Sequence, residues 1–201
     1  HTRHILVNGE KMSKSKGNFY TLEDISDRGF APMDLRMLFI GAHYRSQMNF
    51  TWEALEQAKK NKETLFGTLE RLEGVPDTQD TDTFDGASYL QRFREAMYDD
   101  LNTPEALAIV LEYARDLNTL IDEKAPVARK ALQAVFEKMF FLFGLAIKKE
   151  LVPKEIEDLA KEREIARDGK DFAASDRLRA AIEKHGYKIE DISGGYRLKK
   201  L

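Results

Sequence analysis

The sequence predicts a mainly α-helical protein with small amounts of β structure near its two ends. Between residues 52 and 143, apolar residues recur every three to four positions over several long stretches, which is typical of helices that pack together. Short strand-like segments are expected near residues 5–7 and 187–198. Cysteine is absent, so disulfides, thiolate metal ligands and a cysteine nucleophile are excluded. A helical bundle with smaller flanking parts follows from these observations.

Composition indicates a globular chain without a membrane anchor. Hydrophobic residues make up 42% of the 201 residues and charged residues 33%. No apolar run approaches the roughly 20 residues that a membrane helix needs, and no signal-peptide pattern opens the chain. We therefore expect a cytoplasmic protein. The net charge of −3 divides into +2 for residues 1–50, −6 for residues 51–153 and +1 for residues 154–201. The ends are therefore the basic parts, although local patches rather than totals decide phosphate binding.

The most informative stretch is Lys11-Met12-Ser13-Lys14-Ser15-Lys16-Gly17-Asn18. Ile5-Leu6-Val7 before it predicts a short strand, and Asn8-Gly9 is typical of a tight hairpin turn. After it, Thr21 is expected to cap a helix with acidic residues in its first turn. The lysines thus lie on a loop that can reach a bound polyphosphate and stabilise charge on a departing pyrophosphate. A solvated basic loop is the alternative interpretation.

The next part of the chain predicts a series of helices. Pro32 is expected to open a buried helix over 33–42, with Leu35, Leu38 and Phe39 on its inner face. A long helix over 52–73 follows Thr51, and three more are expected over 88–100, 104–123 and 126–143.

The sequence just before the helix over 104–123 predicts the end of one helix and the start of the next. Thr103 is expected to cap that helix, with Pro104 at its first position. Adjacent Asp99 and Asp100 could suggest metal binding or acid–base chemistry, but we interpret them as helix-end groups.

A smaller unit is expected from Pro153 onward. Its sequence predicts helices over 154–167 and 172–184, then a β-hairpin formed by residues 187–191 and 196–198 around a Ser-Gly-Gly turn. Its expected core consists of Ile156, Leu159, Phe172, Leu178, Ile182, Ile189 and Leu198.

Two stretches carry side chains suited to RNA. Between residues 41 and 50, Tyr44, Arg45 and Gln47 can hydrogen-bond a sugar-phosphate backbone, although a polar connector between helices would look the same. In the terminal unit, guanidinium groups and an aromatic face suit unstacked bases, and ordinary surface charge is the competing explanation. These candidates are Arg177, Arg179, Tyr196 and Arg197.

The string from Lys11 to Ser15 resembles the KMSKS loop of class I aminoacyl-tRNA synthetases. Other strings resemble the cysteinyl-tRNA synthetases of that class, in the same order and over nearly the whole chain. They are His43-Tyr44-Arg45-Ser46-Gln47, Asn102-Thr103-Pro104-Glu105-Ala106, Ala174-Ser175-Asp176-Arg177-Leu178-Arg179 and Gly186-Tyr187-Lys188-Ile189-Glu190-Asp191.

The resemblance implies a C-terminal portion made of three parts. Residues 1–50 would be the edge of a nucleotide-binding catalytic domain with the KMSKS loop and a stem-contact region. Residues 51–147 would be a tRNA-binding helical bundle, and residues 153–201 a small α+β anticodon-binding unit of two helices and a β-hairpin. The family's histidine-rich nucleotide motif and its zinc site for cysteine would lie upstream, so this piece alone is not expected to aminoacylate.

The resemblance also implies the chemistry and the partners. Such an enzyme activates cysteine with ATP, bound with Mg, and transfers it to tRNA-Cys. Lys11 and Lys14 would contact the phosphates, and Ser13 and Ser15 would shape the ATP loop. The RNA contacts would be Tyr44, Arg45, Gln47, Arg177, Arg179, Tyr196 and Arg197. No metal ligands are expected in this chain, nor a membrane partner, and the protein is expected to be a monomer.

Two other functions remain open at this point. A ligase that joins cysteine to an amino sugar shares the lysine loop and the helical domain, but the terminal unit would have no evident purpose there. A free-standing RNA-binding module is the other alternative, and its nucleotide loop would be vestigial. The native upstream sequence distinguishes them, because a synthetase needs a nucleotide-binding domain there.

Overall fold

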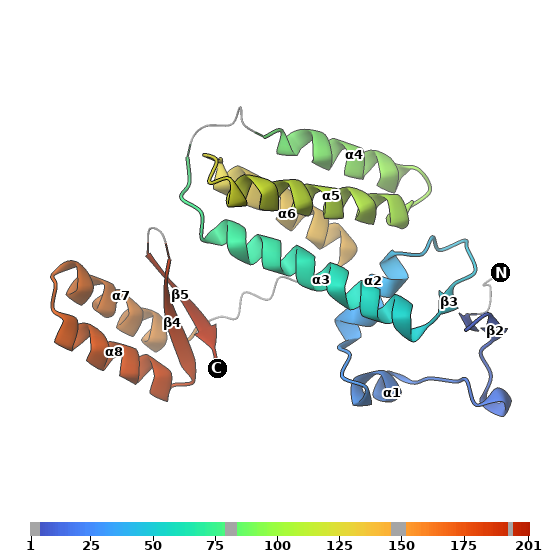
Figure 1. Cartoon of the computed structure of the whole chain (residues 1–201), viewed down its shortest axis with the longest axis horizontal. Helices are drawn as coiled ribbons and strands as arrows, with labels where there is room; N and C mark the ends of the chain where they lie inside the picture. The colour runs from blue at the N-terminus through green and yellow to red at the C-terminus, as the bar shows by residue number, and fades with distance from the viewer. Residues whose placement is uncertain (1–4, 79–83, 146–151, 193–194) are drawn as a thin grey trace. The chain divides into compact units, whose positions relative to one another are not determined.

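A computed structural model describes residues 5–78, 84–145, 152–192 and 195–201 of the chain (Figure 1), except the side chains of Ile192, Arg197 and Lys199. The chain divides into two compact units, residues 1–146 and 147–201. Both are dominated by helices, and the described strands are short, so the expected mainly α fold is confirmed.

The first unit begins with a small sheet and two short helices. Strand β1 (Leu6–Val7) pairs antiparallel with β2 (Glu10–Lys11) and parallel with β3 (Asn49–Phe50). The expected hairpin turn is confirmed, since Asn8 and Gly9 have φ values of 51° and 81°. Helix α1 (Leu22–Asp27) is capped by Thr21 as expected, and α2 (Pro32–Ile40) starts at the proline.

The helical bundle consists of α3 (Trp52–Glu73), α4 (Gly86–Tyr98), α5 (Thr103–Asp122) and α6 (Arg129–Phe143). Helix α3 packs against α5 and α6, and α4 packs against the same two helices (Figure 1). The Thr51 hydroxyl accepts a hydrogen bond from the Ala54 amide, which confirms the expected start of α3. The largest fully buried side chains here include Leu65, Phe93, Tyr113, Leu117, Phe136 and Phe140.

Aromatic contacts organise the centre of the bundle. The rings of Tyr113 and Phe136 meet edge to face with centroids 4.9 Å apart, and Phe136 meets Phe140 at 5.2 Å. The Tyr113 hydroxyl donates to the Leu132 carbonyl at 2.9 Å, which satisfies the one polar group of a fully buried ring. Burial raises the pKa of Tyr113 far above its usual value.

A buried ion pair joins α2 to α3. Asp34 is 1% exposed, and Lys62 Nζ lies 2.5 Å from its Oδ1. Oδ2 of Asp34 accepts from the Ala31 amide at 2.8 Å, at the start of α2. Lys62 lies on the apolar stripe of α3, and its stem runs along the stripe while its ammonium group reaches this carboxylate.

Two local expectations for this unit were wrong. The cap of α5 is Asn102, whose side-chain oxygen accepts from the Glu105 amide at 3.3 Å, so Thr103 is already the first helical residue. Phe39 was expected inside but is 46% exposed, because α2 buries Met37 on its inner face instead.

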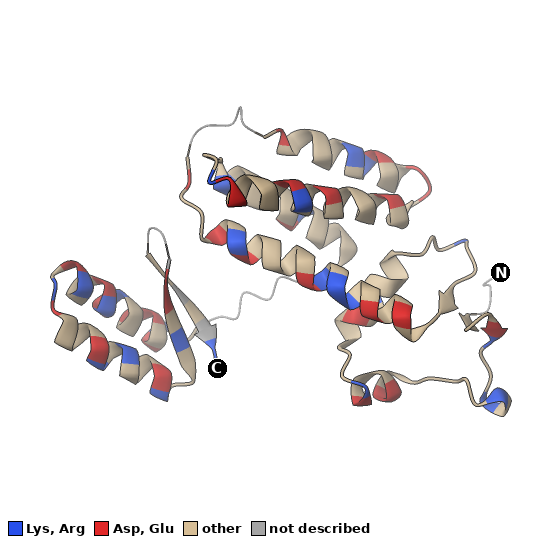
Figure 2. Cartoon of the chain, in the orientation of Figure 1, with Lys and Arg blue, Asp and Glu red and all other residues tan. Residues whose placement is uncertain are grey.

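The second unit has the expected order of two helices and a β-hairpin. Helices α7 (Lys154–Asp168) and α8 (Phe172–Lys184) precede antiparallel strands β4 (Tyr187–Ile192) and β5 (Gly195–Lys200). The core consists of Ile156, Ala160, Ile182, Tyr187 and Ile189, with Leu159 and Leu198 packed against it. Phe172 was wrongly expected in this core, since it begins α8 and is 65% exposed. Figure 2 shows Lys and Arg mixed with Asp and Glu along both helices.

Candidate nucleotide and RNA sites

The lysine loop, residues 11–18, begins at the end of β2 and contains a single turn of 3-10 helix, Lys14–Lys16, before α1. Ser13 precedes the turn, and its hydroxyl accepts from the Lys16 amide at 3.3 Å. Gly17 follows with φ of 68°, the left-handed conformation that glycine adopts without steric cost. The hydroxyls of Ser13 and Ser15 lie 2.9 Å apart. Both serines of the loop therefore take part in its local hydrogen bonds.

Asn18 closes the base of this loop. Its Oδ1 accepts from the Ser13 amide at 2.8 Å, and its Nδ2 donates to the Lys11 carbonyl at 3.2 Å. The loop is thus joined across its two ends by one side chain. Asn18 was not among the site residues predicted from the sequence, although its position directly after Gly17 is the signal that could have identified it.

The three lysines of the loop differ in their contacts. Lys16 forms an ion pair with Glu10 at 2.9 Å, and the Lys14 ammonium lies 5.3 Å from the centre of the Phe19 ring. Lys11 and Lys14 are both exposed, and Phe19 is 43% exposed. Ion pairs and cation–π contacts at such exposed positions are weak. The loop therefore presents cationic groups that an anion in solution can reach.

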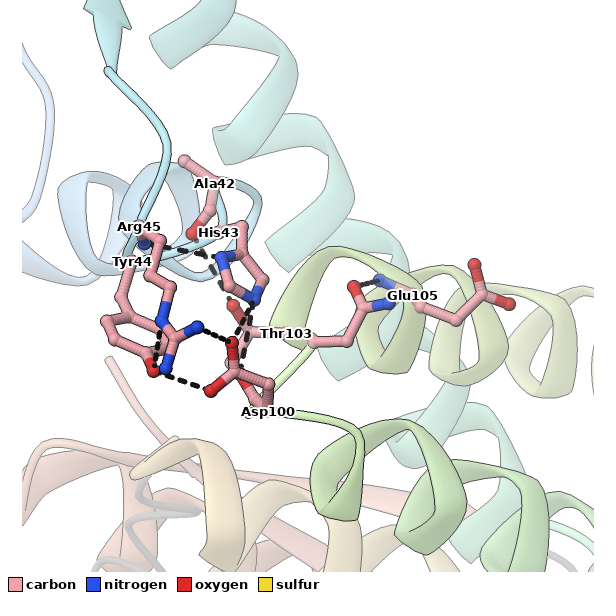
Figure 3. Close-up of polar contacts among 8 residues, drawn as sticks. Ala42, His43, Tyr44, Arg45, Asp100, Thr103 and Glu105 are labelled. Atoms are coloured by element: carbon pink, nitrogen blue, oxygen red, sulfur yellow. Dashed lines mark hydrogen bonds and ion pairs between the residues drawn. The ribbon is translucent and has the colours of Figure 1, made fainter.

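The segment between α2 and β3, residues 41–48, is called the connector here. It is fixed to the loop between α4 and α5 (Figure 3). The Tyr44 hydroxyl donates to Oδ1 of Asp100 at 2.6 Å and accepts from Nε of Arg45 at 2.9 Å. Nη1 of Arg45 lies 3.0 Å from Oδ2 of the same aspartate. Two candidate RNA contacts are therefore tied to one carboxylate from a distant part of the chain.

His43 adds a second tie to the same loop. Its Nδ1 accepts from the Arg45 amide at 3.2 Å, so in the neutral ring Nε2 carries the hydrogen. Nε2 lies 3.1 Å from the Asp100 carbonyl and donates to it in this tautomer. The His43 ring stacks on Tyr44 with centroids 4.9 Å apart. Gln47, the third candidate of the connector, is also exposed.

An apolar cavity of about 860 Å³ opens next to this connector. Its walls come from α2 and its neighbours, and exposed Phe39 and Leu22 lie there together with Ile5 and Met33. Its walls are mainly apolar, so it is not suited to a phosphate.

In the second unit, three arginines converge on Asp191 of β4. Arg163, which is 3% exposed, donates to both carboxylate oxygens at 2.7 and 3.1 Å. Arg167 forms an ion pair with Oδ1, and Arg179 lies 3.4 Å from Oδ2. The hydrogen bonds from Arg163, with the nearby charges of the other two arginines, hold the pKa of Asp191 below its usual value.

This cluster, Arg163, Arg167, Arg179 and Asp191, has a surplus of positive charge and of donors. Nε of Arg163 and Nε of Arg179 are buried without a hydrogen-bond partner among the described residues. A small cavity of about 130 Å³ lies beside the cluster and is also lined by Tyr196. Glu164 and Asp168 also line this cavity, so the donors that a ligand can reach are those of the partly exposed side chains of Arg167 and Arg179.

The candidates predicted in this unit differ in their positions. Arg179 and Tyr196 lie at the cluster, and burial raises the pKa of Tyr196. Arg177 is exposed on α8, and no contact of its side chain is described. The side chain of Arg197 lies outside the described residues. Arg163 and Asp191 were not predicted as site residues, although the four-residue spacing of Arg163 and Arg167 on one helix indicates a shared face.

The described part of the chain contains neither a metal-binding cluster nor a membrane-spanning helix. No group of three or more His, Asp or Glu side chains lies close enough to hold a metal ion there. None of the described helices is both long and apolar enough to cross a bilayer.

Two family models match separate parts of the chain. Residues 1–60 match the model of the tRNA synthetases class I (C) catalytic domain, and residues 92–148 match the DALR domain. The first match contains the lysine loop and the connector, and the second covers the end of α4 with α5 and α6. The chain is therefore similar to class I tRNA synthetases over residues 1–60 and to the DALR domain over residues 92–148.

The curated relatives that match the whole chain are cysteine–tRNA ligases. The chain is 37% identical over 211 residues to the cysteine–tRNA ligase of Leptospira interrogans serovar copenhageni, covering 100% of this chain and 45% of the relative. It is 34% identical to those of Protochlamydia amoebophila and Chlamydia caviae, over 100% of this chain and 43% and 44% of theirs. The resemblance to cysteinyl-tRNA synthetases is confirmed, and the chain is homologous to cysteine–tRNA ligases along its whole length. It spans less than half the length of these relatives.

Proposed function

We propose that the chain supplies the ATP-phosphate loop and the tRNA-binding parts of a cysteine–tRNA ligase, which activates cysteine with ATP and attaches it to tRNA-Cys. One observation carries the proposal: similarity to these ligases covers the whole chain and includes a lysine loop whose cations are exposed. Residues 1–50 would belong to the catalytic domain, residues 51–147 to the tRNA-binding bundle and residues 153–201 to the anticodon-binding unit. Its site of action would be the cytoplasm, as a monomer.

In this proposal, Lys14 and Lys11 bind the phosphates of ATP, and Ser13 and Ser15 hold the turn that presents them. Charge builds up on the pyrophosphate as it leaves, and lysine ammonium groups lower the free energy of that state. The weak contact of Lys14 with Phe19 supports this role, because a phosphate can replace an aromatic ring at little cost.

The RNA would contact both units. Tyr44, Arg45 and Gln47 would meet the sugar-phosphate backbone from the connector. Arg179, Tyr196, Arg177 and Arg197 would serve the second unit, and the partly exposed guanidinium groups of Arg167 and Arg179 beside Asp191 support an RNA site there.

Metal ions enter this proposal only through the substrate and the rest of the enzyme. Mg would arrive with ATP. The side chains described in this chain do not fit a zinc site, since they include no suitable cluster and the sequence has no cysteine. A zinc ion for cysteine recognition would therefore depend on residues outside this chain.

The experiment is tRNA binding by the 201-residue chain. We expect it to bind a tRNA-Cys transcript more tightly than a noncognate tRNA, with an affinity that falls as salt is raised. Equal binding of all tRNAs would instead favour a general RNA-binding module. No binding would favour the ligase that joins cysteine to an amino sugar.

A further inference from the structure

The carboxylate of Asp100 holds several groups of the connector at once. Tyr44 and Arg45 both contact it, at 2.6 and 3.0 Å, and the His43 ring lies 3.9 Å from Oδ2. Figure 3 shows these side chains directed toward Asp100 from the connector. Asp100 is more than 50 positions away from these connector residues in sequence. A contact network of this kind fixes the connector against the bundle.

The backbone of the α4–α5 loop is shaped to present this carboxylate. Asp100 and Leu101 have φ values of 53° and 54°, a left-handed backbone conformation that residues other than glycine rarely adopt. The Asn102 amide donates to the Ala96 carbonyl at 3.1 Å, and the Leu101 amide donates to Met97 at 3.2 Å. These hydrogen bonds from the loop to the last turn of α4 stabilise the conformation.

The network leaves part of Arg45 available. Its guanidinium group has five N–H donors, and the described contacts engage Nε and Nη1. The side chain is 68% exposed, so donors on Nη2 can reach a ligand in solution. Because both engaged atoms are fixed in one plane, the remaining donors are already oriented before binding. Such preorganisation reduces the conformational entropy that binding would otherwise lose.

We propose that Asp100 is a positioning residue for RNA recognition: it orients Arg45 and Tyr44 toward the sugar-phosphate backbone of the tRNA. This role rests on the RNA-binding function proposed above. Asp100 does not itself touch the RNA in this arrangement. Its effect passes through the guanidinium group of Arg45 and the hydroxyl of Tyr44.

When the Asp100 carboxylate is removed, the positioning role and simple charge repulsion predict opposite changes in tRNA affinity. Removing a carboxylate near an RNA site reduces repulsion of the phosphates and should tighten binding. Asp100→Asn removes the charge that holds Arg45, so we expect the dissociation constant for a tRNA-Cys transcript to rise about threefold to tenfold. Asp99→Asn is the matched control, because Asp99 is adjacent and exposed and no contact of its side chain is described. Its dissociation constant should stay the same or fall up to about twofold.

A double-mutant cycle in the 201-residue chain shows whether Asp100 acts through Arg45. Arg45→Ala should weaken binding, and Asp100→Asn should cause a smaller further loss in Arg45→Ala than in the unaltered chain, because only its contact with Tyr44 is left to lose. Tyr44→Phe removes the shared hydroxyl while keeping the ring, and it should weaken binding about twofold to fivefold. It provides an independent test if Asp100→Asn proves unstable in thermal unfolding.

The outcomes separate this inference from the function on which it rests. A loss of affinity from Asp100→Asn that is larger when Arg45 is present than in Arg45→Ala supports the positioning role. Tighter or unchanged binding by Asp100→Asn, or equal losses with and without Arg45, would overturn it while leaving RNA binding intact. If the stability of Asp100→Asn prevents its use, unchanged binding by Tyr44→Phe would overturn it as well. Failure of the unaltered chain to bind tRNA would overturn both proposals.

Discussion

The lysine loop and the Asp191 cluster both hold cations, but by different means. In the loop, the partners of Lys16 and Lys14 lie within six residues in sequence and at the surface. In the cluster, Asp191 binds Arg163 from a position 28 residues away, and Arg163 is almost fully buried. The loop is thus stabilised by local, exchangeable contacts, whereas the cluster is anchored by the buried side chain of Arg163.

The two sites differ in whether their cationic groups are free to move to a ligand or are held in place before it binds. Exposed ion pairs and cation–π contacts contribute little stability, so ligand phosphates can displace them. A buried arginine needs its carboxylate, and losing that partner leaves a charge in the protein interior. The loop lysines can therefore move to a substrate, while the cluster presents donors in a fixed arrangement.

The largest expected effect comes from breaking the cluster. Asp191→Ala should lower the free energy of unfolding of the second unit by roughly 3 kcal/mol, because it leaves the Arg163 charge buried without its partner. Hydrogen–deuterium exchange of residues 154–192 measures this effect. Asp176→Ala on α8 is the control, since Asp176 is exposed and no contact of it is described. Equal effects of the two substitutions would show that the ion pair of Arg163 with Asp191 does not stabilise the unit.

The ion pair of Arg163 with Asp191 also makes the stability of the second unit depend on pH. The pKa of Asp191 is lower in the folded chain than its ordinary value of 3.8, so its charged form stabilises the fold above that value. This contribution is lost as the pH falls through the lowered pKa. The stability difference between the unaltered chain and Asp191→Asn should be constant from about pH 5 to pH 7 and shrink below about pH 4. Urea unfolding across this range tests it, and a difference that grows at acidic pH would contradict the assignment.

A smaller effect is expected in the loop. Phe19→Leu removes the ring that holds the Lys14 ammonium, so the affinity of the chain for tripolyphosphate should rise about twofold to fivefold. Phe141→Leu is the control, since Phe141 is 82% exposed on α6. Isothermal titration calorimetry provides the measurement. An affinity that is unchanged or lower in Phe19→Leu would mean that the ring does not compete with phosphate.

Elements with strong local signals could be predicted from the sequence. The Asn8-Gly9 turn and Thr51 identified the hairpin and the start of α3, since left-handed turns and capping are local properties. The apolar stripes identified the other helices of the bundle but not their ends, because α4 is Gly86–Tyr98 rather than 88–100 and α6 begins at Arg129 rather than at residue 126. The cap of α5 was misplaced by one residue because Asn102 and Thr103 are both good capping residues. Phe172 was placed in the core on its apolar character, but the first residue of a helix can face solvent.

The tertiary partners of the site residues could not be predicted. Asp100 was interpreted as a helix-end group, and its contacts with Tyr44 and Arg45 depend on how α2 and the bundle pack. Arg163 likewise reads as one of many surface charges on α7 until β4 brings Asp191 to it. Periodicity gives the face on which a residue lies, but it does not identify the residue opposite.

The most direct test of the central claim is adenylation by an enzyme that contains this loop. The Leptospira interrogans relative, with these 201 residues replacing its matching segment, provides such an enzyme. Lys14→Ala should lower its cysteine-dependent pyrophosphate exchange by about a hundredfold or more, because stabilisation of the leaving pyrophosphate is lost. Lys16→Ala, which removes the lysine paired with Glu10, should keep most of the activity. A normal exchange rate in Lys14→Ala would contradict the account.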